Sequence, residues 1–165
     1  MGTLYSIAFT IKMSYKGSHK IEGYFSYVVP PLEGLWQQEG MEGIDYTRKN
    51  ELEWISMIRL PEICHTGRVH MGEERSGTKE RDRRFQGRSI FRYEEGLCVQ
   101  CMHIGSYDEE PETIRKMEEY VKEAGYRVDL SEGRKHHEIY LSDPRRTAPE
   151  RLKTVIRQPV CRKDG

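Results

Sequence analysis

The stretch HHEIYLS, residues 136–142, combines groups that could do chemistry with the alternation of a β-strand. Because successive side chains of a strand point to opposite faces, Glu138 and Tyr140 share a face with His136. A carboxylate beside an aromatic ring suits a cationic or electron-poor aromatic ligand, since the charge attracts the ligand and the ring stacks on it. A carboxylate in a pocket also suits general acid–base chemistry, so Glu138 and Tyr140 are the candidate catalytic residues.

The other face of this predicted strand carries His137, Ile139 and Leu141, and we expect it to pack on helices. A glutamate on a solvated sheet face is the second interpretation of Glu138. The alternation of side chains alone does not choose between a solvated carboxylate and a buried one.

Histidines and cysteines do not follow a metal-ligand pattern. His136 and His137 are adjacent, so on a strand they point apart and cannot share a metal. Cys98 and Cys101 have the two-residue gap of a zinc or redox motif, but they lie in an alternating stretch where residues three apart face opposite sides. We expect the cysteines to be small core residues, and we expect no metal and no cofactor.

Aromatic residues on or beside the predicted strands are the second signal for a ligand site. Most aromatic residues belong to a core or its rim, but rings on the same side as Glu138 would form an aromatic-walled cleft. The six residues placed in this way are Tyr24, Tyr27, Trp36, Trp54, Tyr107 and Tyr140.

The elements that must position these groups follow from periodicity and from the breaks made by glycine and proline. The spacing predicts helices over 4–15 and 111–124 and strands over 24–29, 52–60, 97–104, 136–141 and 154–160. The second half therefore reads strand, helix, strand, strand, and the first half reads helix, strand, strand. We interpret this as an imperfect duplication.

Residues 66–92 do not fit this pattern, because they hold 12 charged residues and only five apolar ones, with neither a helical nor a strand period. A long solvated loop is one interpretation, although structureless loops of this length are uncommon inside small domains. A double frameshift in the coding DNA is the other, and sequencing that DNA decides between them.

Length and composition restrict the class of protein. The 165 residues are enough for one domain, and 27 basic residues balance 27 acidic ones, so no global field favours nucleic acid or an anionic membrane. No apolar run approaches the roughly 20 residues that span a bilayer, and no signal peptide is evident. We expect a cytoplasmic protein with reduced thiols.

Four segments together resemble the GyrI-like small-molecule-binding family, and specifically its stand-alone members. They are VVPPLEGLW (28–36), EWISMIRLPE (53–62), GLCVQCMHIGSYDEEPETI (96–114) and HHEIYLSDPRRTAPERLKTVIRQPV (136–160). The resemblance implies an α+β fold in which an antiparallel sheet with flanking helices is built from two pseudo-symmetric β-α-β-β units that form a ligand cleft. It implies a single domain over 1–165, in which the first unit lacks its leading strand and 66–92 takes the place of its second helix.

The resemblance also implies roles for individual residues. Glu138 matches a glutamate at the bottom of the aromatic-lined cleft of relatives that bind cationic aromatic drugs, and some stand-alone relatives hydrolyse cyclopropane rings of DNA-alkylating compounds. By this resemblance Glu138 orients or deprotonates the attacking water, and Tyr140 holds the planar ligand beside it. The other ligand-binding candidates are Trp36, Trp54, Tyr107, Tyr27 and His103.

The function implied is a cytoplasmic binder of planar, cationic or hydrophobic compounds. Hydrolysis of cyclopropane-containing toxins is an additional activity that the resemblance leaves open. The alternative is a non-enzymatic effector-binding protein that acts through a partner such as a topoisomerase or a transcription regulator. No DNA-reading element is evident in the sequence, so we expect neither direct nucleic-acid binding nor a membrane partner; homodimerisation stays open.

Overall fold

The computed structural model describes residues 2–17, 21–38, 44–63, 89–131 and 133–163. The contacts of the chain group it into two units, one formed by Met1–Pro30 with Ile58–Tyr93 and the other by Pro31–Met57 with Glu94–Gly165. The candidate site lies within the second of these units.

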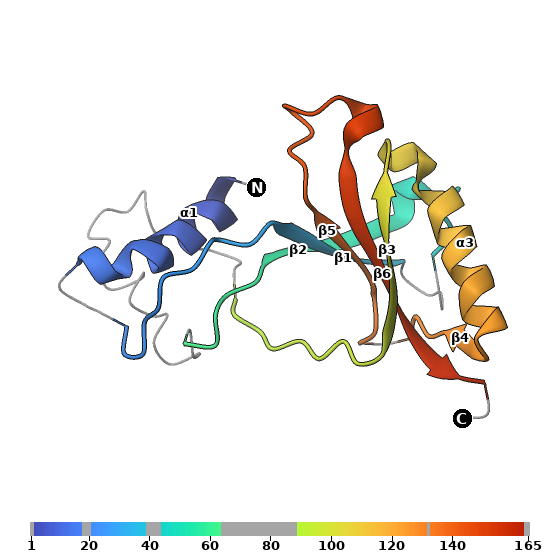
Figure 1. The fold of residues 1–165 in the computed structure, drawn as a ribbon, viewed down its shortest axis with the longest axis horizontal. Helices are drawn as coiled ribbons and strands as arrows, with labels where there is room; N and C mark the ends of the chain where they lie inside the picture. The colour runs from blue at the N-terminus through green and yellow to red at the C-terminus, as the bar shows by residue number, and fades with distance from the viewer. Residues whose placement is uncertain (1, 18–20, 39–43, 64–88, 132, 164–165) are drawn as a thin grey trace. The chain divides into compact units, whose positions relative to one another are not determined.

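The second unit contains an antiparallel sheet, and the chain as a whole is an α+β protein. The order of its strands is β2-β1-β5-β6-β3, and a short sixth strand, β4, pairs with the end of β6 (Figure 1). The strands are β1 (Leu32–Gln38), β2 (Leu52–Ile58), β3 (Cys98–Ile104), β4 (Tyr126–Val128), β5 (His136–Tyr140) and β6 (Lys153–Arg162).

The register of the sheet fixes which side chains share a face. Residues directly opposite each other in an antiparallel pair lie on the same face. Glu138 on β5 lies between Gly34 on β1 and Ile156 on β6, and Gln158, two residues along β6, shares that face. All these side chains therefore point to one side of the sheet.

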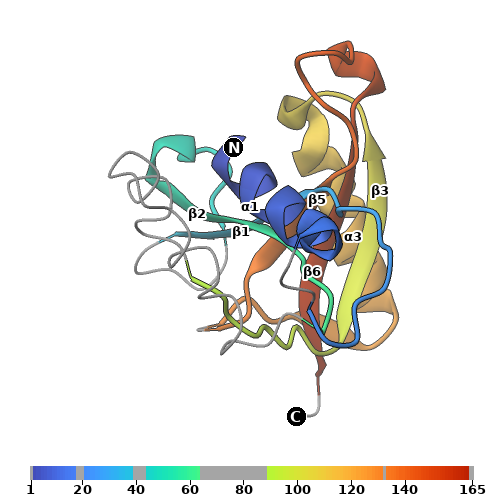
Figure 2. The same cartoon turned by 90° about the vertical axis from the view of Figure 1, so that its left-hand side faces the viewer.

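Helix α3 (Glu110–Glu123) covers that side. Pro111 stands in its first turn, and Gly125 follows its end with a φ of 82°, a left-handed conformation that glycine adopts without strain. The apolar stripe of α3 packs on β6, where Ile114 and Met117 form a buried cluster with Ile156. Figures 1 and 2 both show α3 running along one side of β6 and β3.

The first unit contains helix α1 (Gly2–Lys12), which continues into a 3-10 turn at Met13–Lys16. Ala8 and Ile11 on α1 are buried, as the helical spacing of its apolar residues predicts. The Tyr24 hydroxyl donates a 2.6 Å hydrogen bond to the carbonyl of Lys12, and the rings of Tyr15 and Tyr24 stack at 5.3 Å. These contacts close the chain back onto the end of the helix.

The predicted duplication agrees with the order of the strands. The second half supplies β3, α3, β5 and β6 in the expected sequence, with the short unpredicted strand β4 between α3 and β5, and the first half supplies α1, β1 and β2. β1 and β5 pair at the centre of the sheet, so that β2 and β6 lie at equivalent places on either side of them. Within the described residues no strand lies beyond β2, at the place that β3 occupies beyond β6.

Two predictions from the sequence are wrong. The strand expected over 24–29 is irregular chain, with Val28 83% exposed, and the strand lies instead at Leu32–Gln38, after the two prolines. Cys101 is exposed rather than part of the core, although Cys98 and Cys101 do face opposite sides. The frameshift hypothesis for 66–92 concerns a segment of which 66–88 lie outside the described residues, while 89–92 form neither helix nor strand.

Candidate ligand-binding site

Glu138 lies at the centre of the candidate site and is 7% exposed. Two neighbours on the same strand hold its carboxylate. The hydroxyl of Tyr140 donates a hydrogen bond of 2.7 Å to Oε2, and His136 Nε2 lies 3.0 Å from Oε1. The buried interpretation of Glu138 is therefore right, and both of its oxygens have partners, as burial of a carboxylate requires.

A second hydrogen bond joins this carboxylate to the aromatic residues. Trp36 Nε1 donates to the Tyr140 hydroxyl over 3.0 Å, so that Trp36, Tyr140 and Glu138 form a continuous chain of donors and acceptors. The rings of Trp36 and Trp54 stack with centroids 5.4 Å apart and an interplanar angle of 22°. Trp54 is 40% exposed, so this pair of indoles gives the candidate site a partly exposed aromatic surface.

Gly34 on β1 allows these rings to approach the sheet. A Cβ atom at this position would lie 2.9 Å from the Tyr140 hydroxyl, 3.1 Å from Trp36 Nε1 and 3.3 Å from Trp54 Cε3. Each distance is shorter than an ordinary van der Waals contact. The absence of a side chain opposite Glu138 is therefore what lets three aromatic residues gather over it.

The beginning of α3 supplies two further groups. A capping box formed by Ser106 and Glu109 sets the turn that precedes the helix, and Tyr107 lies within that turn. The rings of Tyr107 and Tyr140 meet edge to face with centroids 6.1 Å apart. Glu110, the first residue of α3, is 7% exposed and brings a second carboxylate to the same region.

The charges of the two carboxylates act on the tyrosines of the site. Burial, and after it the charge of Glu138, raises the pKa of Tyr140. Burial, followed by the charges of Glu110 and Glu138, likewise raises the pKa of Tyr107. Both hydroxyls therefore keep their protons at neutral pH, and that of Tyr140 donates to Glu138. The site presents negative potential beside aromatic rings, which favours a positively charged or N–H-bearing planar group.

Four of the predicted residues, Trp36, Trp54, Tyr107 and Tyr140, gather around Glu138. His103 lies on the same face of the sheet, but its ring nitrogens are engaged by Thr113 Oγ1 at 2.8 Å and by the carbonyl of Ser106 at 3.0 Å. These bonds hold the beginning of α3 against β3, so His103 supports the site through the position of the helix.

Tyr27 belongs to the other unit, where its ring lies 6.4 Å from that of Tyr24 and 6.2 Å from that of Phe25. Its role as a ligand contact stays a prediction.

Three residues that shape the site could not be picked out from the sequence. Glu110 precedes Ile114 by four residues, and this spacing places it on the apolar stripe of α3. In the sequence it is easily taken for an ordinary acidic residue of a first helical turn, where acidic residues are favoured. Gly34 was available only as a weak signal, a glycine inside a strand. Tyr46 lies in the connection between β1 and β2, where its ring meets that of His136 edge to face with centroids 6.0 Å apart. No sequence pattern predicts this contact.

The opposite face of β5 corrects another expectation. We expected His137 to lie among helices, but α3 covers the Glu138 face, and His137 is enclosed by charged groups. Its Nε2 lies 2.8 Å from Glu33 Oε2 and its Nδ1 lies 2.9 Å from Glu95 Oε1, while Arg157 pairs with the other oxygen of Glu95 at 2.8 Å. Burial opposes a charge on His137, but the hydrogen bonds to Glu33 and Glu95 outweigh it and raise the pKa of the imidazole.

Among the described residues, no group of three or more His, Cys, Asp or Glu side chains could hold a metal ion. Of the helices in the described part of the chain, none is long and apolar enough to cross a bilayer.

Comparison with known proteins agrees with this architecture. The family model described as GyrI-like small molecule binding domain matches residues 1–160. No curated protein matches this chain significantly.

Three crystal structures of proteins from Listeria innocua are similar to 97% of this chain. One is an uncharacterized conserved protein, 40% identical, with a TM-score of 0.82 over 78% of its length. Another is a hydrolase, 36% identical, with a TM-score of 0.80 over 77% of its length. The third, also a hydrolase, is 40% identical, with a TM-score of 0.82 over 77% of its length. Since the family model spans nearly the whole sequence, the chain belongs to the GyrI-like small-molecule-binding domain family.

Proposed function

We propose that this protein acts in the cytoplasm as a binder of planar aromatic compounds that are cationic or hydrophobic. The observation that carries the proposal is the hydrogen-bonded chain from Trp36 through Tyr140 to the buried Glu138, with Trp54 stacked at its open end. The indoles supply a flat apolar surface for a ring system, and the carboxylate supplies the charge that a cationic ring system needs.

Burial of Glu138 lets its charge discriminate between cationic and anionic ligands. A carboxylate that is removed from water interacts strongly with a charge brought close to it, because the surrounding medium screens poorly. Glu110 adds a second negative group on the same side, as its effect on the pKa of Tyr107 indicates. An anionic ligand of the same shape would meet both charges and should be rejected.

A second activity, hydrolysis, is favoured by two similar crystal structures that are described as hydrolases. For a cyclopropane ring conjugated to a carbonyl group, the oxygen of water forms a bond to a ring carbon, and the strained carbon–carbon bond breaks. The released electron pair moves into the conjugated carbonyl, which takes up a proton. We propose that Glu138 receives the proton of the attacking water, while Tyr140 fixes the direction of the carboxylate. Such an activity would serve to detoxify DNA-alkylating compounds.

The non-enzymatic alternative uses the same site differently. An effector-binding protein would hold the ligand in the aromatic site and pass the signal to a partner such as a topoisomerase or a transcription regulator. It would show saturable binding without any turnover of a cyclopropane-bearing compound. Turnover is therefore the observation that separates the two functions.

A fluorescence titration with ethidium, a planar cationic dye, tests the binding proposal. We expect Glu138→Gln to weaken ethidium binding about tenfold, because one lost ion pair of this kind is worth on the order of 1–2 kcal/mol. Glu119→Gln removes an exposed carboxylate from α3 and serves as the matched control with unchanged affinity. Equal affinities of wild type and Glu138→Gln would refute the role of the carboxylate. Chromatographic analysis of a cyclopropane-bearing alkylator after incubation then tests hydrolysis, which Glu138→Gln should abolish.

A further inference from the structure

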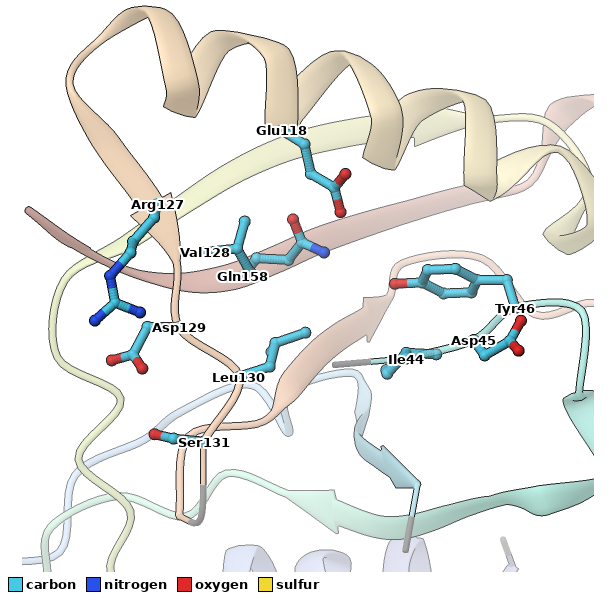
Figure 3. A pocket seen from close by; sticks show the side chains of 10 residues that line it. All are labelled: Ile44, Asp45, Tyr46, Glu118, Arg127, Val128, Asp129, Leu130, Ser131 and Gln158. Atoms are coloured by element: carbon cyan, nitrogen blue, oxygen red, sulfur yellow. The ribbon is translucent and has the colours of Figure 1, made fainter. Parts of the chain in front are cut away.

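A cavity of about 810 Å³ lies beside the aromatic site, on the same side of the sheet. It is lined by residues 44–46 between β1 and β2, by Glu118 of α3, by residues 127–131 and by Gln158 of β6 (Figure 3). Its volume lies within the range of pockets that hold small organic ligands. Nothing in the function proposed above uses this cavity.

The wall of the cavity contains a buried carboxamide. Gln158 on β6 is 1% exposed. Within the described residues neither its Oε1 nor its Nε2 makes a hydrogen bond of ordinary geometry, and its contact with the Tyr46 hydroxyl is weak, although it acts to lower the pKa of that tyrosine against the larger effect of burial. Figure 3 shows its side chain extending from β6 toward Tyr46, below Glu118. A buried amide that is so weakly paired carries a desolvation penalty, and such groups in native structures call for an explanation. A bound ligand group that pairs with the amide provides one.

Tyr46 connects this carboxamide with the aromatic site. Its hydroxyl lies 3.5 Å from His136 Nδ1, and His136 in turn contacts Glu138 through Nε2. Burial, and then the charges of Glu118 and Glu138, raise the pKa of Tyr46, so its hydroxyl is protonated at neutral pH. Tyr46 therefore stands between the two sites and can donate to a ligand that occupies either of them.

We propose that this cavity is a hydrogen-bonding subsite for a planar ligand group with an N–H donor next to a carbonyl acceptor, such as a primary amide or a lactam. The carboxamide of Gln158 presents a donor and an acceptor side by side, which a second amide matches with two parallel hydrogen bonds. Among the charged groups of the cavity wall, Asp45 pairs with Arg48 and Asp129 pairs with Arg134. Glu118 therefore favours N–H groups and disfavours carboxylates, while Arg127 is the one cation on the described part of the wall. The subsite extends the proposed function, because one ligand would span the aromatic site and this cavity. That part of the inference rests on the function proposed above.

Nitrogen-15 NMR of the full chain with benzamide as the probe tests this subsite. The side-chain NH₂ signal of Gln158 is identified as the one that disappears in Gln158→Leu. We expect benzamide to shift this signal saturably and acetophenone, which has the carbonyl but no N–H, to bind at least tenfold more weakly. Benzoate should leave the signal unmoved. Benzamide that leaves it unmoved, or acetophenone that binds equally well, overturns the proposal.

Variants separate this subsite from the aromatic site. Gln158→Leu should lose benzamide binding at least tenfold while its affinity for ethidium changes less than twofold. Tyr46→Phe keeps the Gln158 signal and should weaken benzamide about threefold or more, so the test does not depend on the folding of one variant. Shifts confined to the indole N–H signals of Trp36 and Trp54 would place benzamide in the aromatic site and contradict the subsite. Failure of ethidium to bind the wild type would instead contradict the function proposed above.

Discussion

Gly34 lies directly opposite Glu138 in the antiparallel pair of β1 and β5. This pairing gives the carboxylate its surroundings, because the missing side chain opens the space that Tyr140, Trp36 and Trp54 fill. The candidate site thus depends on the pairing of two strands that lie about a hundred residues apart in the sequence. A change at Gly34 should reach Glu138 through the rings without touching any charged group.

Gly34→Ala should therefore disturb the aromatic cluster. Its new Cβ would lie 2.9 Å from the Tyr140 hydroxyl and 3.1 Å from Trp36 Nε1, so the rings must move. Overpacking of this kind costs about 1–3 kcal/mol of unfolding free energy. We expect an altered near-ultraviolet circular dichroism spectrum and weaker ethidium binding. Gly2→Ala, whose new Cβ meets nothing within 4 Å, is the control and should change neither.

Tyr140→Phe should test the hydrogen-bonded chain. The substitution keeps the ring but removes the donor to Glu138 and the acceptor for Trp36. Leaving such groups unsatisfied costs about 1–3 kcal/mol, which urea unfolding can measure. The same substitution at Tyr120, which is 64% exposed, should leave stability unchanged. Equal unfolding free energies for wild type and Tyr140→Phe would mean that these hydrogen bonds contribute nothing to the stability of the fold.

Trp54→Leu should separate ligand stacking from stability. Trp54 is 40% exposed, so its loss removes a surface for the ligand more than a part of the core. Aromatic contacts contribute about 0.5–1.5 kcal/mol beyond the buried area, which corresponds to a roughly two- to tenfold weaker affinity for ethidium. Tyr120→Leu provides an aromatic-to-aliphatic control away from the site. An ethidium affinity that Trp54→Leu leaves unchanged would exclude the indole as a contact.

The charged cluster around His137 should make stability depend on pH. The pKa of His137 is raised above 6.5, so its contribution is complete below pH 6.5 and is lost as pH rises through the raised value. Burial opposes the charge of Glu95, but His137 and Arg157 outweigh burial and lower the pKa of Glu95 below 4.5. The contribution of Glu95 to the unfolding free energy is therefore lost as pH falls through that lowered value.

The unfolding free energy contributed by this cluster should therefore be greatest between about pH 4.5 and 6.5. Urea unfolding at pH 5.5, 7 and 8.5 measures the decline above this window. His137→Gln should remove that decline. A variant that loses stability with rising pH as steeply as the wild type would show that another group causes it.

The strand of Glu138 could be predicted because its signal is local. Alternation of side chains over 136–140 is enough to place Glu138 and Tyr140 on one face, and the helix after Pro111 follows from the spacing of its apolar residues. Burial of the carboxylate could not be derived in this way, since it depends on α3 covering the face that carries Glu138. The resemblance to a known family supplied that part.

The strand β1 shows why the rest could not be predicted. Residues 24–29 have the composition of a strand, whereas Leu32–Gln38 contains Gly34 and Glu33, which lower the propensity for strand. Pairing with β5 decides the outcome, and this contact joins residues far apart in the sequence. The three-residue strand β4 and the partners of His137 also depend on tertiary contacts, so the sequence does not predict them.

A crystal structure of the full chain with ethidium bound tests the central claim most directly. We predict that the ring system of ethidium stacks on the indole of Trp54 and that its positive charge faces the carboxylate of Glu138. The side chain of Tyr140 should keep its hydrogen bond to Glu138 in that complex. Ethidium bound away from these residues, with Glu138 still enclosed by His136 and Tyr140 alone, would contradict the account.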